Sequence, residues 1–270
     1  MTGWPDQART KIVKGLARAE EVSHPFTLVY TLILAAMARL FLREPDEAWR
    51  LAHRSVTLAR EQGFSLYPAL GAVVQNCAEL QRGKLQAGLA MVKEAFAAYR
   101  ATGARLFLPF FLAVLAEGYL QAESIQDGLQ VVTEALQLTE TNLDVFWEAE
   151  LYRLKGELVL QSEVRRPESP EKKQKAKGKK QKAKMTDPRP LTSDSQGEAE
   201  AYFQKAIEVT RNQGAKSLEL RAVMSLARLW QLQGKRHEAR NTLSEIYGWF
   251  TEGFETKDLQ EAKALLKEFT

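Results

Sequence analysis

Apolar residues recur along this chain with the spacing of helices. In Leu89, Val92, Ala95, Phe96 and Tyr99 the steps are three, three, one and three, which places these side chains on one helical face. No segment combines sustained alternation with β-branched residues, so we expect no sheet. The pattern predicts an all-α protein with helices at residues 5–21, 26–43, 45–62, 66–82, 84–102, 106–122, 125–140, 145–161, 197–213, 217–233, 236–248 and 256–268.

Small residues recur every forty positions. The three series are Ala8, Ala48, Gly88 and Gly128; Gly15, Ser55, Ala95 and Ala135; and Ala199 and Ala239. A constant period of this length is typical of stacked-repeat proteins, in which each unit buries its apolar face on its neighbours. We therefore expect one domain over residues 1–270, a right-handed α-solenoid of about five and a half helix-turn-helix repeats.

The two ends of the array differ. Residues 5–21 match the second helix of a repeat, so we expect either a piece of a longer protein or an open apolar edge that supports a homo-oligomer. Residues 249–270 read as a C-terminal cap, with Thr256 as N-cap of its helix. The cap has an apolar stripe of Leu259, Ala262, Leu265, Leu266 and Phe269.

A basic insertion interrupts the fourth full repeat at residues 162–193. It holds eleven Lys and Arg against four Asp and Glu, so the insertion carries +7 and the remaining chain 4 − 7 = −3. Because it has no apolar period, we expect a disordered loop. Two other interpretations stay open, a localisation patch and sequence-blind attachment to nucleic acid, although aromatic residues for base stacking are missing.

Candidate chemistry is sparse. Cys77 is the one cysteine and lies in an apolar stretch, which favours a buried inert thiol. His24, His53 and His237 have no metal-ligand spacing, and no phosphate-binding glycine motif occurs. We therefore expect no cofactor, no metal and no enzymatic activity. Since neither a signal peptide nor a membrane-spanning segment is visible, we expect a cytoplasmic protein without membrane attachment.

The small-residue pattern resembles the tetratricopeptide repeat, with Leu112, Ala116, Tyr119, Gly128 and Ala135 at matching positions. Its longer period is similar to the repeats of MalT-like transcriptional regulators. The runs AKSLELRAVMSLARLWQLQGK (215–235) and YGWFTEGFETKDLQEAKALL (247–266) resemble the C-terminal end of bacterial signalling proteins that join a nucleotide cyclase or another effector to an NTPase and such repeats. None of the cyclase or NTPase motifs is present.

The repeat resemblance implies that the first helix of each pair lines a concave groove. The groove candidates are Tyr30, Met37, Phe110, Glu117, Glu150, Arg153, Glu157, Arg221 and Arg228. The charged members could anchor a peptide by charge-assisted hydrogen bonds. Alternatively, they pair with one another across adjacent helices.

The favoured function is a protein-interaction and regulatory scaffold that binds a peptide, a protein or a neighbouring domain in the groove, as part of a bacterial signalling protein. A second possibility is small-ligand sensing of the MalT-like kind, which requires an enclosed polar pocket. A third is non-specific nucleic-acid binding through the lysine-rich insertion.

Overall fold

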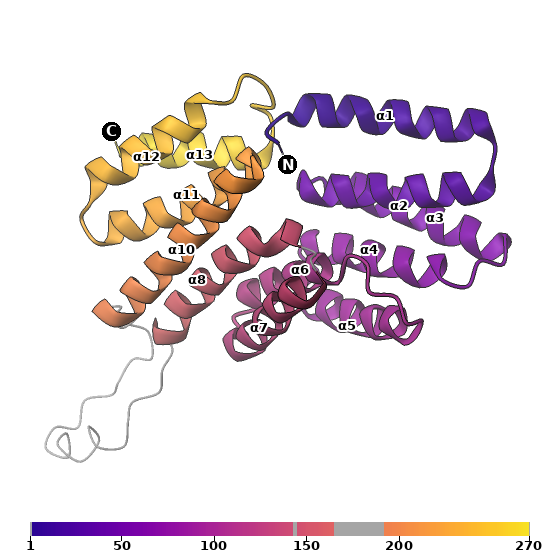
Figure 1. Ribbon diagram of the computed structural model, residues 1–270, viewed down its shortest axis with the longest axis horizontal. Helices are drawn as coiled ribbons and strands as arrows, with labels where there is room; N and C mark the ends of the chain where they lie inside the picture. Colours follow the sequence, from indigo (N-terminus) through magenta and orange to yellow (C-terminus); the bar gives the residue numbers. More distant parts are fainter. Residues whose placement is uncertain (1, 143–144, 165–191, 270) are drawn as a thin grey trace, which may run out of the picture.

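Every regular element in the part of the chain that the structure describes is a helix. The computed structural model describes residues 2–142, 145–164 and 192–269, and Figure 1 shows the arrangement. The elements are α1 (Pro5–Val22), α2 (Pro25–Phe41), α3 (Pro45–Glu61), α4 (Tyr67–Gln81), α5 (Leu85–Ala101), α6 (Leu108–Gln121), α7 (Ile125–Asn142), the 3-10 turn η1 (Val145–Trp147), α8 (Glu148–Val164), α10 (Ser193–Gln213), α11 (Lys216–Leu232), α12 (Arg236–Gly248) and α13 (Lys257–Glu268).

These helices confirm the all-α prediction, and the main difference lies beside the insertion. Helix α8 continues to Val164, and α10 begins at Ser193 rather than at residue 197. The early start has a local cause, because the Thr192 side chain accepts a hydrogen bond from the Ser195 amide and so caps the helix. The predicted disordered loop therefore loses a few residues to helix at each end. Its remainder, residues 165–191, lies outside the described residues.

The forty-residue period reappears in the backbone. Gly3, Arg43, Gly83 and Glu123 all have positive φ and stand forty residues apart. The last three of these positions follow the first helix of a pair. A second series with positive φ follows the second helices, at Ser23, Gly63 and Gly103. A left-handed residue just beyond a helix directs the chain into the next one, so each repeat turns in the same way.

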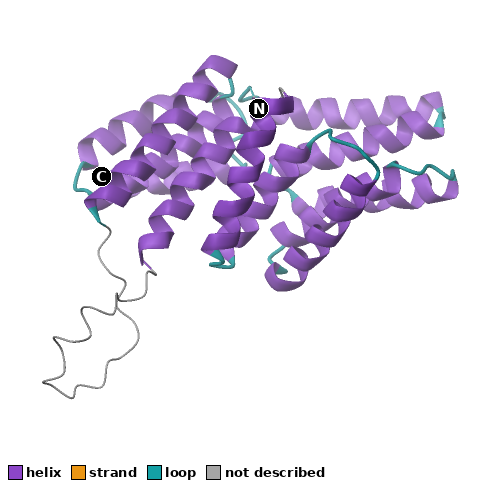
Figure 2. Cartoon of the chain, turned by 60° about the horizontal axis from the view of Figure 1, so that its bottom comes forward, coloured by secondary structure: helices purple, strands orange, loops and turns teal. Residues whose placement is uncertain are grey.

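The helices form an α-solenoid in which the first helix of each pair lies on the inside. Each helix packs on its neighbours in sequence, and the first helices α2, α4, α6, α8, α11 and the cap helix α13 also contact one another in succession. Such contacts between alternate helices arise when one row follows the shorter, inner path of a superhelix. Figure 2 shows the resulting stack of helix pairs.

The periodic small residues lie where helices approach most closely. A Cβ atom added to Gly88 would lie 3.0 Å from the Leu80 Cα, and one added to Gly128 would lie 2.6 Å from a Leu158 methyl carbon. Larger side chains would push these helices apart, which explains the regular forty-residue spacing of small residues along the chain.

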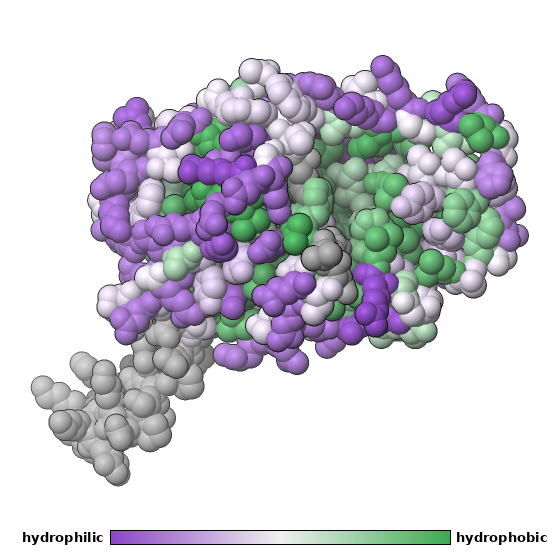
Figure 3. Space-filling view, viewed as in Figure 1, coloured by the Kyte–Doolittle hydropathy of each residue, from purple (hydrophilic) through white to green (hydrophobic). Residues whose placement is uncertain are grey.

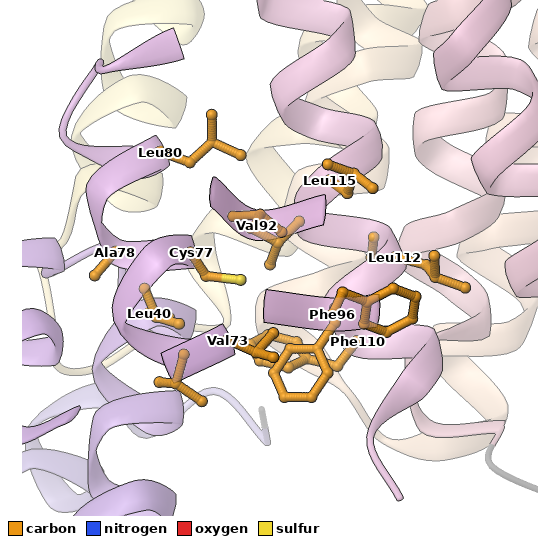
Figure 4. Close-up of a cluster of buried hydrophobic side chains, with 14 of the residues drawn as sticks. Leu40, Val73, Cys77, Ala78, Leu80, Val92, Phe96, Phe110, Leu112 and Leu115 are labelled. Atoms are coloured by element: carbon orange, nitrogen blue, oxygen red, sulfur yellow. The ribbon is translucent and has the colours of Figure 1, made fainter. Parts of the chain in front are cut away.

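The core is a continuous strip of buried side chains between the two rows. Figure 4 shows its middle, where Cys77 lies among Leu40, Val73, Val92 and Phe110. Cys77 is fully buried, and this burial raises the pKa of its thiol, which agrees with the inert cysteine predicted from the sequence.

The two ends of the solenoid meet, which the sequence did not indicate. Trp4 and Trp249 lie with ring centroids 5.2 Å apart, and the Gly253 amide donates to an Asp6 carboxylate oxygen at 2.9 Å. A Glu252 carboxylate oxygen accepts from the amides of Asp6 and Gln7, each at 3.0 Å. The expected open edge at residues 5–21 is therefore covered at its first turn. Figure 1 shows α1 beginning beside the C-terminal segment.

The C-terminal segment packs as the predicted cap, with one local correction. Leu259, Ala262 and Leu265 of α13 are buried, and α13 contacts both α11 and α12. Thr256 precedes the helix, but its side chain does not cap the helical amides. Its hydroxyl instead donates to the Gly253 carbonyl at 2.7 Å, because the preceding turn brings that carbonyl close.

Candidate functional site

An apolar pocket of about 380 Å³ opens on the concave side of the solenoid. It is lined by Trp4, Pro5, Ala8, Met37, Ala38, Phe41, Leu42, Phe107, Phe110, Phe146, Trp147 and Ser217. We call it the aromatic pocket. Figure 3 shows an apolar, hollowed surface beneath α1, between the two halves of the molecule. The lining comes from α1, α2, α6, η1 and the start of α11, so the pocket exists only because the solenoid curves back on itself.

Trp147 is the centre of the aromatic packing. Its ring centroid lies 4.7 Å from that of Phe110 and 5.3 Å from that of Phe41. The neighbouring Phe146 is 51% exposed and stands at the rim. η1 ends where α8 begins, and this short turn directs the Phe146 ring toward solvent and the following Trp147 ring into the core. Offset and edge-to-face pairs of this kind hold rings in defined positions.

A charged cluster lies beside the pocket. Arg221 of α11 donates to an Asp258 carboxylate oxygen at 2.7 Å and to the Phe41 carbonyl at 2.8 Å. Arg43 contacts the same Asp258 at 3.2 Å and Glu261 at 3.1 Å. The hydrogen bond to Phe41 and the ion pairs of Arg43 connect α2 and its following turn with α11 and α13, which are about 180 to 218 residues away in sequence.

Glu150 completes the cluster from α8. Its carboxylate accepts two hydrogen bonds from Arg153, at 2.8 and 3.0 Å, and lies 3.6 Å from the Arg221 guanidinium. Burial alone raises the pKa of Glu150, but the charges and hydrogen bonds of Arg153, with Arg221 and Arg43, outweigh it and lower the pKa to about 2. Burial likewise lowers the pKa of Arg153, and Glu150 more than reverses this. Glu150 and Arg153 are therefore both ionised at neutral pH.

The predicted groove residues separate into three groups. Met37 and Phe110 line the aromatic pocket. Glu117, Glu150, Arg153, Glu157 and Arg221 lie in or next to the charged cluster. Tyr30 belongs to a separate aromatic group with Tyr67, and Arg228 is exposed on α11 and lines neither feature.

Four of the charged candidates contact one another, mostly within α8. Of these contacts, the one between Glu150 and Arg221 crosses between helices, as the alternative interpretation expects. Arg153 contacts Glu150 and lies 3.7 Å from Glu157, whose carboxylate also accepts from the Ser225 hydroxyl at 2.6 Å. Their hydrogen-bonding capacity is largely used inside the protein. They form a wall of the concave face and have few donors or acceptors left to bind a peptide.

The pocket also differs from the one expected of a ligand sensor. An enclosed polar cavity was required, whereas the lining is mostly aromatic and aliphatic, with the Ser217 hydroxyl among its few polar groups. Sequence reasoning missed Phe41, Trp147 and Trp4, because they lie at helix ends and turns outside the positions of the repeat pattern. The adjacent aromatic residues Phe146 and Trp147 just before a helix were the available signal.

Two further properties follow from the described residues. They contain no group of three or more His, Cys, Asp and Glu placed to hold a metal ion. Among their helices, none combines the length and the apolar character that crossing a membrane requires.

No protein-family model and no curated protein matches the chain. The solved structures that are similar to this chain include two of a putative kinesin light chain from Podosopora anserina with nearly identical TPR-like repeats. One is a point variant, with 15% identity and a TM-score of 0.49; the other has 14% identity and a TM-score of 0.48. Each alignment covers 83% of this chain and 95% of the other. This likeness is too distant to indicate a partner.

Proposed function

We propose that the chain is a protein-interaction scaffold that docks an apolar segment of a partner in the aromatic pocket. The single observation behind this proposal is an open, aromatic-lined pocket on the concave face of an α-solenoid. Exposed rings such as Phe146, which is 51% exposed, place apolar surface in water, and covering that surface with a partner contributes favourable free energy to binding. The functional residues would be Met37, Phe110 and Trp147.

The charged cluster supports docking indirectly. Breaking a buried ion pair by removing one partner costs about 3–5 kcal/mol, so ligands gain little by competing for Arg221 or Glu150. The same pairs connect distant helices and hold the pocket walls in place before a partner arrives. A preformed site lowers the ordering cost of binding.

We place this scaffold in a larger bacterial signalling protein, on the basis of the sequence resemblance of residues 215–235 and 247–266. These two runs build α11 and the C-terminal cap, which supply Arg221, Trp249 and Asp258 to the closure of the solenoid. A second candidate is the sensing of a small apolar molecule. The pocket volume, about 380 Å³, lies within the usual range for small-ligand sites and favours this alternative.

A peptide-display selection on the full chain tests the proposed function. Selected peptides are expected to carry aromatic or large aliphatic anchors and to change the tryptophan fluorescence of the chain on binding. Met37→Glu would place a carboxylate in the pocket wall and should weaken binding at least tenfold. Met91→Glu is the matched control, because Met91 is 43% exposed on the outer helix α5.

Equal loss of binding in both variants, or peptides without apolar anchors, would contradict pocket docking. The small-molecule alternative predicts instead that no peptide is enriched, while an apolar probe such as 1-anilinonaphthalene-8-sulfonate binds the chain and is excluded by Met37→Glu.

A further inference from the structure

The wall between the aromatic pocket and the charged cluster is made of rings. Phe41, Phe110 and Trp147 line the pocket, and the same three residues line a small cavity of about 20 Å³ on the side of the cluster. Glu117 and Glu150 line that cavity as well. An occupant of the pocket is therefore separated from these carboxylates by a layer of aromatic side chains.

The cluster holds more negative than positive groups. Its carboxylates are Glu117, Glu150, Glu157, Asp258 and Glu261, and its guanidinium groups are Arg43, Arg153 and Arg221. Three positive and five negative groups give a formal charge of 3 − 5 = −2. Arg228 is exposed on α11 and forms no ion pair with them. A surplus of this kind in a partly buried site attracts a cation, because water and salt screen it incompletely.

Glu117 contributes to this surplus without a partner of its own. It is half-buried on α6 and forms no hydrogen bond or ion pair with the described residues. Burial lowers the pKa of Arg153 and Arg221, and the charge of Glu117 is among those that more than reverse this effect. Gln81, which lines the same small cavity, holds a buried side-chain oxygen that accepts no hydrogen bond from the described residues. Both groups leave negative charge behind the wall.

The pocket side of the wall is suited to a cation. Trp4 and Phe146 are 38% and 51% exposed, and Phe41 and Phe107 are partly exposed. The face of an aromatic ring is negative and attracts an ammonium or guanidinium group within about 6 Å. The chain itself contains such a contact, because the guanidinium carbon of Arg221 lies 5.1 Å from the Phe41 ring centroid.

Positive groups beside the pocket are already neutralised. No charged residue lines the pocket itself, and four cations adjoin its lining residues in the sequence. Each of the four is paired: Arg9 and Arg39 with Glu44, Arg43 with Asp258 and Glu261, and Lys216 with Glu219. A cation that enters the pocket therefore meets a surplus of negative charge and no unpaired positive charge next to the lining.

We propose that the partner segment anchors itself in the aromatic pocket with a cation, a lysine or arginine side chain that adjoins an apolar residue. The inference rests on the proposed scaffold function and names the chemistry of its partner. The apolar residue fills the pocket, the aliphatic stem of the basic side chain follows the aromatic wall, and its charged end lies over the exposed rings. The Ser217 hydroxyl, which is part of the lining, is available to accept a hydrogen bond from it.

Peptides selected by display on the full chain test this chemistry. We expect lysine or arginine next to the apolar anchor of the selected peptides. Replacing the basic residue by norleucine retains an aliphatic stem and removes the charge. Fluorescence anisotropy of the labelled peptides should show that this replacement weakens binding about tenfold.

Glu117→Gln locates the cation, because it removes the charge, keeps the shape of the side chain and breaks no hydrogen bond to the described residues. It should weaken binding of the basic peptide about threefold and leave binding of the norleucine analogue unchanged. Glu94→Gln is the matched control, since Glu94 is exposed on the outer helix α5, and it should change the affinity of neither peptide. Circular dichroism melting curves verify that both variants fold.

Equal affinity of the basic peptide and its norleucine analogue would overturn the proposal, as would selected peptides without a basic residue. The same effect of Glu117→Gln on both peptides would also overturn it, because the substitution would then act through the fold and not on the cation. The proposed scaffold survives each of these results if Met37→Glu still blocks binding. If no peptide is selected, or if Met37→Glu has no effect, docking in the pocket is wrong and this inference is rejected with it.

Discussion

Glu150 is a carboxylate that remains charged although it is only 5% exposed. Two hydrogen bonds from Arg153 and the charges of Arg221 and Arg43 lower its pKa to about 2, against the effect of burial. A residue with a depressed pKa in the folded protein stabilises the fold above its ordinary pKa. That stability is lost as the pH falls from about 5 toward 2. The acid sensitivity of this protein is therefore expected to depend strongly on one residue.

We predict that Glu150→Gln lowers the free energy of unfolding by about 3–5 kcal/mol at pH 7, because it leaves buried cations without a counter-charge. The difference from the parent chain should shrink between pH 5 and pH 3, where the parent loses its own contribution. Urea denaturation at several pH values measures this. Glu47→Gln, which removes a largely exposed pair with Arg50, is the control and should change stability little. A difference that stays constant with pH would contradict the assignment.

Within the helices, glycine has two different roles in this chain. Gly156 of α8 faces the fully buried Phe203 of α10, and an added Cβ would lie 2.5 Å from that ring. Gly15 of α1 faces open space. Alanine favours helix over glycine by about 1 kcal/mol at either position, so packing alone decides the difference between them.

Gly156→Ala should therefore lower the free energy of unfolding by about 1–3 kcal/mol, because the rigid ring cannot withdraw. Gly15→Ala should raise it by about 0.5–1 kcal/mol. Thermal and urea denaturation of the two variants measure both effects. If the two substitutions shift stability in the same direction, the close approach of α8 and α10 is not what maintains a glycine at 156.

As a whole, the molecule is a solenoid whose ends are joined. Arg43 lies just beyond α2 and contacts Asp258 and Glu261 from α13, while Trp4 packs on Trp249. Curvature alone would leave the two ends free to move relative to each other. The closure contacts fix that relation and, with it, the shape of the aromatic pocket.

Arg43→Glu should open the closure, because the new carboxylate would repel Asp258 and Glu261. We expect a larger radius of gyration in small-angle X-ray scattering and a loss of about 1–3 kcal/mol in the free energy of unfolding. Arg100→Glu is the matched control, since Arg100 pairs with Glu134 between helices close in sequence. An unchanged radius of gyration in Arg43→Glu would show that the aromatic contacts suffice to hold the ends together.

Local patterns predicted the features that depend on neighbouring residues. Apolar spacing placed the helices, and the small residues placed the close contacts such as Gly88 with Leu80. Two groove candidates, Met37 and Phe110, line the pocket because they lie on the inner face of regular first helices. Trp147 and Phe41 were missed, because residues at helix ends have no place in a periodic pattern.

By itself, the sequence determined the helices, their forty-residue period and their stacking, because these follow from side chains a few positions or one repeat apart. Only the tertiary structure decided that Arg221 meets the Phe41 carbonyl and that Trp4 reaches Trp249. These contacts join residues 180 and 245 positions apart, and they depend on small rotations accumulated over many repeats. No local pattern records that sum, so the closure and the pocket could be seen only in three dimensions.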